Sequence, residues 1–185
     1  MVDGLVGSEM CIRDRDKIGI AATRLNATII REAFTEAGIS VSGIIPSSVN
    51  EAVQLLEERS VVVMGGTEPG HTTDAVATRL AIAVKSNKCI IATNVEKVFN
   101  EDPRGNPNAK SFDNLTHGEL QQIVGPAEHD EAGKSSVVDP IAVLEATMAN
   151  LELNIIDGRK IERFKHAILG LDFEGTKISS EGKNE

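Results

Sequence analysis

Apolar and polar residues follow one another in blocks whose period changes along the chain. Residues 18–37 are rich in helix formers, and their apolar side chains recur at helical spacing, as at Leu25 and Ile29. Gly38 follows at the place where a C-terminal cap is expected. The β-branched run 39–45 then predicts a short strand. The first part of the chain therefore predicts a helix followed by a strand.

The remaining blocks continue this alternation. Uninterrupted apolar runs at 61–64 and 89–92 predict strands that are covered on both faces, as in parallel sheets. Further helices are expected over 49–58, 74–85, 115–124, 140–150 and 160–166, and further strands over 151–156 and 175–178. Strands that alternate with helices indicate an α/β fold with a mainly parallel sheet. Because ligands bind at the carboxyl ends of the strands in such sheets, the loops after Met64 and Ala92 are candidate site segments.

The two ends of the chain do not share this pattern. Residues 1–15 show no clean period of two or 3.6, and we interpret them as a leader or as sequence joined to the gene rather than as part of the fold. Residues 16–178 contain all the regular blocks, and residues 179–185 form a polar tail. The sequence therefore predicts one domain, over residues 16–178.

Composition narrows the class of protein. The chain has 185 residues, of which 41% are hydrophobic and 25% charged, as in ordinary globular domains. Its net charge of -9 repels nucleic-acid backbones, and 3% aromatic residues leave few rings for base stacking, so no nucleic-acid partner is expected. No apolar run is long enough for a membrane span.

The two cysteines, Cys11 and Cys89, give no disulfide framework, so a reducing cytoplasm is expected, with Cys89 buried. His117, His129 and His166 have no metal-ligand spacing and are expected at the surface.

The loop after the run at 61–64 carries the sharpest local chemistry. Residues 65–74 contain three glycines and three threonines, directly before a predicted helix. The glycines leave the backbone open to a ligand, and free N–H groups at a helix N-terminus favour an anion or a carbonyl oxygen. Neither a Walker loop nor a Gly-x-Gly-x-x-Gly motif is present. The alternative is an ordinary strand–loop–helix connection that Thr72 or Thr73 caps.

The second candidate loop, residues 93–103, also leaves a predicted buried strand. Thr93 and Asn94 can hydrogen-bond a heteroaromatic edge, Phe99 can cover a ring face, and Asp102 can accept from a ribose hydroxyl. Taken by themselves, these residues fit an Asn/Asp/Pro turn better than a binding site.

Together the two loops resemble archaeal-type UMP kinases of the amino acid kinase superfamily. The resemblance rests on four motifs in order, at 16–27, 64–75, 93–103 and 135–140. It implies a three-layer fold with helices on both sides of the sheet, incomplete at the N-terminus. It also implies transfer of the ATP γ-phosphoryl group to UMP with Mg²⁺, which yields UDP for pyrimidine nucleotide biosynthesis. A homohexamer is implied as well, with residues 16–37 as a subunit contact.

The same resemblance implies roles for single residues. Asp74 matches the acidic residue that orients catalytic groups, although an ordinary acidic residue in a first helical turn is the alternative. The implied UMP contacts are Asp16, Thr67, Glu68, Pro69, Gly70, His71, Thr72 and Thr73, and the implied ATP contacts are Thr93, Asn94, Phe99 and Asp102. Arg24 and Asn26 either line the site or a subunit contact, or lie on a solvated helix face. No metal ligands are expected from the chain itself.

The sequence departs from the family in two places. The family begins with Gly-rich loops that grip the transferring phosphoryl group, and nothing before Asp16 supplies them, so we expect the chain as given to lack kinase activity. Glu96 and Lys97 stand where the family usually has Asp-Gly, which puts the tight turn in doubt. The alternatives are another kinase of the superfamily, acting on carbamate, glutamate or isopentenyl phosphate, and a non-catalytic nucleotide-binding domain.

Overall fold

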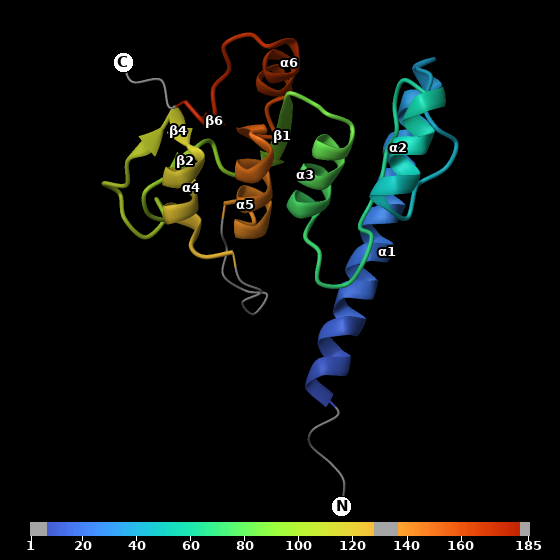
Figure 1. Cartoon of the computed structure of the whole chain (residues 1–185), viewed down its shortest axis with the longest axis horizontal. Coiled ribbons are helices and arrows are strands. Elements are labelled where there is room, and N and C mark those ends of the chain that lie inside the picture. Colours follow the sequence, from blue (N-terminus) through green and yellow to red (C-terminus); the bar gives the residue numbers. More distant parts are fainter. Residues whose placement is uncertain (1–6, 128–136, 182–185) are drawn as a thin grey trace, which may run out of the picture. The chain divides into compact units, whose positions relative to one another are not determined.

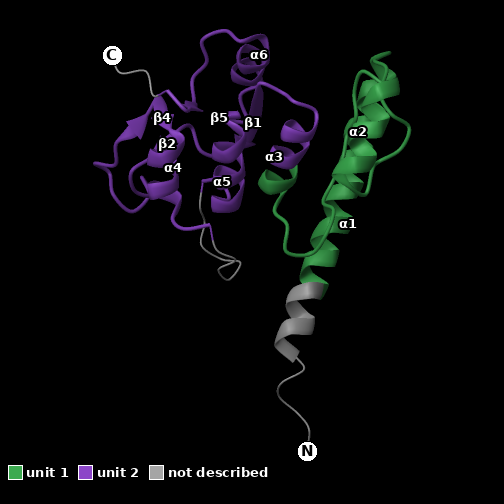
Figure 2. Cartoon of the chain, viewed as in Figure 1, with its two compact units in different colours: residues 1–76 green, residues 77–185 purple. Residues whose placement is uncertain are grey.

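The computed structural model of the protein describes residues 7–127 and 137–181, with side chains from residue 14 onward. The chain forms two compact units, residues 1–76 and residues 77–185 (Figure 2). Figure 1 shows the elements in chain order. The helices in the described residues are α1 (Gly7–Glu36), α2 (Val49–Glu58), α3 (Thr73–Ala83), α4 (His117–Val124), α5 (Pro140–Ala149) and α6 (Ile161–Leu169). The strands there are β1 (Lys88–Thr93), β2 (Val98–Phe99), β3 (Ser111–Phe112), β4 (Asn114–Thr116), β5 (Glu152–Asp157) and β6 (Thr176–Ser179).

Helix α1 is longer than its sequence pattern predicts. It begins at Gly7, so residues 7–15 are helical although they show no clean apolar period. Once a helix has formed, extending it by a turn is cheap, and these residues do not need an apolar face of their own. The end of the helix follows the prediction, since Gly38 has the positive φ of +71° that a C-terminal cap requires.

Helix α2 forms over the predicted residues 49–58 and begins with a serine cap. The Ser48 hydroxyl accepts the Glu51 N–H at 3.2 Å, as a capping serine should. The Glu51 carboxylate, however, accepts from the backbone and the hydroxyl of Ser47 rather than from Ser48. These hydrogen bonds lower the pKa of Glu51.

The two strands predicted in the first unit, 39–45 and 61–64, are not formed. Val41 and Val61 pair in one isolated parallel bridge, in which the Val61 carbonyl accepts the Ser42 N–H at 2.9 Å. The run 61–64 is half-buried rather than covered on both faces. A strand needs neighbours for its backbone groups, and in the part of the chain that the structure describes these two runs pair only with each other.

The second unit contains the sheet that the alternation predicts. Its strand order is β1-β5-β6-β4, with parallel pairing of β1 with β5 and of β4 with β6, and antiparallel pairing of β5 with β6. Two of the three pairings are parallel, which confirms the mainly parallel α/β fold.

Helices cover both faces of this sheet. On one face Ile91, Leu153 and Ile155 pack into an aliphatic core with residues of α3, α4 and α5. The core also contains Cys89, which is buried as predicted. On the other face α6 contacts β1 and β5, and the Lys88 ammonium group donates to the Ala167 carbonyl of α6. Because successive strand residues point to opposite faces, β5 is buried on both sides.

The segment 96–113, over which the sequence pattern predicts no helix or strand, contains a two-stranded antiparallel ribbon of β2 and β3. The ribbon is attached to the sheet through Thr176 of β6. Its hydroxyl accepts the Val98 N–H at 2.9 Å and donates to the Phe112 carbonyl at 2.6 Å. Two-residue strands carry almost no periodic signal, which explains why the sequence did not reveal them.

Helix α4 begins later than predicted, because Leu115 belongs to strand β4. Thr116 and Glu119 form a complete capping box at its start. His117, predicted to be a surface residue, is instead buried, and its Nε2 lies 2.8 Å from the Leu151 carbonyl. His166 hydrogen-bonds the Asp172 carbonyl through Nδ1, and His129 lies outside the described residues.

Helix α5 begins as predicted, with Pro140 in its first turn and the Asp139 carboxylate accepting the Ile141 N–H at 2.8 Å. None of the helices within residues 7–127 and 137–181 combines the length and the apolar character needed to cross a membrane.

Candidate functional site

The first candidate loop, residues 65–73, contacts helix α1 through two hydrogen bonds. The Thr23 hydroxyl accepts the Gly66 N–H at 2.8 Å, and the Asp16 carboxylate accepts the Gly70 N–H at 2.8 Å. The loop also comes very close to the helix backbone. A Cβ atom on Gly65 would lie 2.7 Å from the Arg24 backbone nitrogen, so only glycine fits at this position.

Helix α1 and this loop line a cavity of about 240 Å³. Its lining from α1 is Arg15, Asp16, Gly19, Ile20 and Thr23, and from the loop and the start of α3 it is Gly66, Glu68, His71 and Thr73. Four predicted UMP contacts, Asp16, Glu68, His71 and Thr73, therefore lie around one cavity. Thr67, Pro69, Gly70 and Thr72 belong to the same loop but not to this lining.

The α1 side of this cavity shows what sequence reasoning missed. Gly19, Ile20 and Thr23 follow Asp16 at intervals of three and four residues, which places them on the same helix face. This spacing was visible in the sequence once Asp16 had been singled out.

Thr72, a predicted contact of UMP, also has a structural role at the start of α3. The Thr72 hydroxyl accepts the Ala75 N–H at 3.2 Å, which confirms Thr72 as a helix cap. Asp74 follows in the first turn of α3 and is half-buried. Its role as an organiser of catalytic groups stays a prediction.

Arg24 has a structural partner within the first unit. Its guanidinium group donates to the Pro46 carbonyl at 2.7 Å and to the Ile45 carbonyl at 2.8 Å. These bonds attach the segment before α2 to α1. Asn26, the other polar residue singled out on this helix, is exposed.

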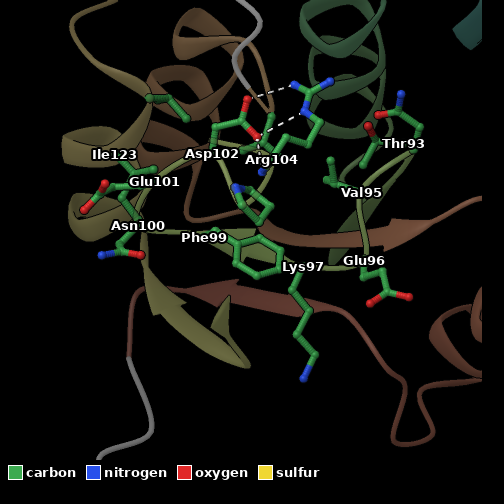
Figure 3. Close-up of a pocket in the computed structure, with 14 residues that line it drawn as sticks. Thr93, Val95, Glu96, Lys97, Phe99, Asn100, Glu101, Asp102, Arg104 and Ile123 are labelled. Atoms are coloured by element: carbon green, nitrogen blue, oxygen red, sulfur yellow. Dashed lines mark hydrogen bonds and ion pairs between the residues drawn. The ribbon is translucent and has the colours of Figure 1, made fainter. Parts of the chain in front are cut away.

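The second candidate loop lines a larger cavity, of about 640 Å³, within the second unit (Figure 3). All four predicted ATP contacts, Thr93, Asn94, Phe99 and Asp102, lie in its lining. The rest of the lining is Val95, Glu96, Lys97, Asn100, Glu101, Pro103, Arg104, Ile123, Val124 and Val137. The structure therefore brings together residues that the sequence alone assigned to an ordinary turn.

The aliphatic wall of this cavity was not predicted. Ile123 and Val124 come from the end of α4, and Val137 precedes α5, far from residues 93–104 in sequence. No local motif connects these segments, so only the tertiary fold reveals the wall. An aliphatic wall beside polar side chains suits a flat, heteroaromatic ligand.

Asp102 is engaged by a neighbouring arginine (Figure 3). Its carboxylate accepts from Arg104 Nη2 at 3.0 Å, from Nε at 3.1 Å and from the Arg104 backbone N–H at 2.9 Å. The Arg104 side chain is the main cause of the lowered pKa of Asp102. The Asp102 carboxylate is thus ionised near neutral pH, and a ribose hydroxyl would share this acceptor with Arg104.

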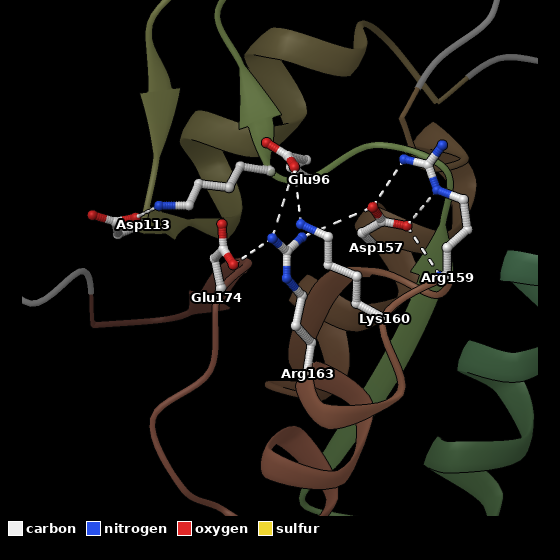
Figure 4. A network of polar contacts seen from close by, with 8 residues as sticks. Glu96, Asp113, Asp157, Arg159, Lys160, Arg163 and Glu174 are labelled. Carbon is white, nitrogen blue, oxygen red and sulfur yellow. Dashed lines mark hydrogen bonds and ion pairs between the residues drawn. The ribbon is translucent and has the colours of Figure 1, made fainter.

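The departure at Glu96 and Lys97 does not prevent the turn. Among the described residues other than glycine, only Lys85 and Asn150 have a positive φ, so position 97 does not need glycine here. Both side chains form ion pairs instead, Glu96 with Lys160 (Figure 4) and Lys97 with Asp113.

A buried carboxylate lies beside this loop. Asp157, the last residue of β5, is 1% exposed and accepts from Arg159 Nε at 2.8 Å. The hydrogen bond from the Arg159 side chain is the largest cause that lowers the pKa of Asp157 to about 2. Sequence reasoning missed this pair, because Asp-Gly-Arg after a strand looks like an ordinary turn.

Known proteins resemble this chain over most of its length. The amino acid kinase family profile matches residues 6–157. The chain is 38% identical to uridylate kinase from Methanococcus aeolicus over 89% of its own length and 70% of that protein. It is 36% identical to uridylate kinase from Pyrococcus abyssi, covering 71% of that protein.

Solved structures show the same relationship. The crystal structure of uridylate kinase from Archaeoglobus fulgidus superposes with a TM-score of 0.76 at 37% identity, over 89% of this chain and 71% of that one. The UMP kinase from Bacillus anthracis, at 23% identity and a TM-score of 0.75, shows the shared fold. The profile match and these relatives together establish that the chain belongs to the amino acid kinase family.

Proposed function

We propose that this protein is a UMP kinase, which transfers the γ-phosphoryl group of ATP to UMP and yields UDP for pyrimidine nucleotide synthesis. The observation that carries the proposal is the identity of 38% to a uridylate kinase over 89% of the chain. The two cavities support it, because each is lined by residues of one of the two loops on which the resemblance to the family rests.

The cavity on α1 has the chemistry for a nucleoside monophosphate. The Asp16 carboxylate is a hydrogen-bond acceptor at its edge, suited to the hydroxyls of a ribose. The hydroxyl of Thr73, which lines the cavity, can hydrogen-bond the edge of a uracil ring. The other predicted contacts of this loop, Thr67, Pro69, Gly70 and Thr72, are part of this proposal.

The cavity of the second unit has the chemistry for adenosine. Phe99 can cover one face of a purine, and Ile123 and Val124 add an aliphatic wall to the same cavity. Thr93 and Asn94 offer hydrogen-bonding groups at the end of β1, where ligands of parallel sheets bind.

Phosphoryl transfer needs alignment and charge compensation more than covalent chemistry. We propose that Asp74 orients the groups that carry positive charge, since a carboxylate cannot itself offset the charge of the phosphates. Mg²⁺ would enter with ATP, because it takes most of its ligands from phosphates, water and one or two carboxylates. Among the described residues, no group of three or more His, Cys, Asp or Glu side chains is arranged to hold a metal ion by itself.

We also propose that the protein is cytoplasmic and self-associates, as a hexamer by analogy with the family. Ile18, Leu25 and Ile29 of α1 are 70%, 65% and 62% exposed in the single chain. Their positions, seven and four residues apart, fall on one side of the helix, which suits a subunit contact. Light scattering on the purified chain measures the oligomeric state.

Thermal unfolding with added UMP tests the proposal. A ligand that binds only the folded state stabilises it, by about 2.7 kcal/mol at a hundred times its Kd. We expect UMP to raise the melting temperature, and Asp16→Asn to weaken UMP binding by about tenfold, the value of a hydrogen bond to a charged group. Asp14→Asn, an exposed carboxylate on the same helix, should bind UMP like the unchanged chain.

Different outcomes separate the alternatives. A melting temperature that UMP leaves unchanged, together with a rise on adding carbamoyl phosphate or glutamate, would assign the chain to another kinase activity of the family. A coupled ATP and UMP assay checks the separate expectation that the chain as given lacks turnover, which sustained UDP formation would contradict.

A further inference from the structure

The turn between β5 and α6, residues 158–160, contacts the end of β1. The Gly158 N–H donates to the Thr93 carbonyl at 2.9 Å, which continues the parallel pairing of Asp157 with Thr93. A Cβ atom on Gly158 would lie 3.0 Å from the Ala92 Cβ. The turn therefore packs tightly against the strand from which the ATP-side loop leaves.

Arg159 connects this turn to the loop itself. Its Nη2 donates to the Asn94 carbonyl at 3.1 Å and to Asp157 Oδ2 at 2.8 Å, while its Nε donates to Asp157 Oδ1. The Arg159 side chain is 67% exposed, but its guanidinium group is oriented by a carboxylate that is 1% exposed (Figure 4). Two parallel bonds to a fixed carboxylate fix the plane of the guanidinium group, and with it the direction of the bond to Asn94.

A second connection lies further along the same loop. Glu96 pairs with Lys160 Nζ at 3.4 Å and with Arg163 Nη2 at 3.7 Å. Arg163 is itself buried and also pairs with Asp157 at 3.9 Å and with Glu174. Asp157 is thus the common partner of Arg159 and Arg163.

We propose that Asp157 and Arg159 are positioning residues for the nucleotide site. They set the backbone at Asn94, so that Thr93 and Asn94 present their hydrogen-bonding groups to the ligand in the second-unit cavity. The proposal rests on the proposed function for the identity of the ligand as adenosine, but the contact between the turn and the loop does not depend on it.

The first arm of the test measures binding to the unchanged chain and to Arg159→Ala. Removing a charged donor from a carbonyl changes an equilibrium by about tenfold, so we expect Arg159→Ala to weaken ATP binding by about that factor. Adenosine binding should fall by the same factor, because the residue acts on the loop and not on the phosphates. UMP binding should stay within about twofold of its original value.

Two further variants make the binding measurement more specific. Arg159→Lys keeps the charge but lacks the planar fork, and should lose nearly as much affinity as Arg159→Ala. Lys165→Ala removes an exposed cation from α6 that pairs only with Glu162 among the described ion pairs, and should bind ATP and adenosine like the unchanged chain. A loss confined to ATP would mean that Arg159 contacts phosphate directly, which would overturn the positioning role.

The second arm reads the loop without any ligand. Hydrogen–deuterium exchange of a peptide that covers residues 93–98 should be faster in Arg159→Ala than in the unchanged chain, and unaltered in Lys165→Ala. Equal exchange in all three proteins overturns the proposal whatever their affinities. If exchange responds but the unchanged chain binds neither ATP nor adenosine, the positioning role is supported and the proposed function fails.

Discussion

The two candidate loops are attached to their units in different ways. Residues 65–73 follow a run in which Val61 forms an isolated bridge with Val41. They are attached to α1 by the Thr23 hydroxyl and the Asp16 carboxylate. Residues 93–103 begin at the end of β1, a paired strand of the four-stranded sheet. They are attached to the β5–α6 turn by Arg159 and by the ion pairs of Glu96.

Because of this difference, we expect the two loops to tolerate different kinds of substitution. The first loop depends on a close approach of its backbone to α1. Its hydrogen bonds to α1 are single bonds, one accepted by a neutral hydroxyl and one by a carboxylate. A larger side chain in the loop should therefore disturb it most. The second loop depends on charged groups around one buried carboxylate, so changes of charge and pH should disturb it most.

The largest effect is expected at Gly65. A Cβ atom there would lie 2.7 to 2.8 Å from the backbone of Arg24, which cannot rotate away. We expect Gly65→Ala to lower the free energy of unfolding by about 1–3 kcal/mol, the usual cost of overpacking, and to abolish the effect of UMP on the melting temperature. Gly43→Ala is the matched control, since a Cβ atom at Gly43 meets nothing within 4 Å.

Urea unfolding followed by far-UV circular dichroism measures this change, since the chain has no Trp or Tyr for fluorescence. Equal midpoints for the Gly65→Ala and Gly43→Ala proteins would show that the loop can move off the helix, and the contrast between the two loops would then be wrong.

A smaller effect is expected from Thr23→Val, which keeps the shape of the side chain but removes its hydroxyl. The Gly66 N–H would lose its acceptor in a part-buried hydrogen bond, which costs about 1 kcal/mol, the low end of the usual range, and UMP binding should weaken in proportion. Thr35→Val removes a hydroxyl whose partner, among the residues that the structure describes, is the Arg31 carbonyl of the same helix, and it is the control. Equal UMP affinity in the two variants would contradict the role given to Thr23.

The second unit was the more predictable of the two. The apolar runs of β1 and β5 and the Asp139–Pro140 start of α5 carry strong local signals, and the structure contains all three. β5 is buried on both faces, whereas β1 alternates between buried and half-buried residues and leaves Ala92 exposed, so the prediction that residues 89–92 are covered on both faces is only partly right. The loop residues Thr93 and Asp102 were found through the resemblance, and the cavity then brought them together.

The first unit shows where such reasoning stops. The runs 39–45 and 61–64 have the composition of strands, but composition does not supply a partner, and only Val41 and Val61 pair. In the second unit, the burial of His117 was missed for a related reason, because its partner Leu151 lies far away in sequence and is brought near by the fold. The pair of Asp157 and Arg159 is local, and it was missed because Asp-Gly-Arg after a strand looks like an ordinary turn.

The smallest effect, and the one specific to the second loop, is a change in the dependence of stability on pH. Asp157 has a folded-state pKa of about 2, below its usual value of 3.8, mainly because Arg159 donates to it. Between pH 4 and pH 2 the unfolded chain therefore binds more protons at this residue than the folded chain does, so stability falls as the pH falls through this window.

Asp157→Asn should remove part of that slope, while Asp102→Asn, whose carboxylate pairs with an exposed arginine, should remove less because solvent screens the pair. Urea midpoints at pH 2, 3 and 4 measure the slopes. If Asp157→Asn keeps the full slope and Asp102→Asn flattens it, the acid sensitivity lies in the exposed part of the loop. The buried carboxylate would then not be the point on which the second loop depends.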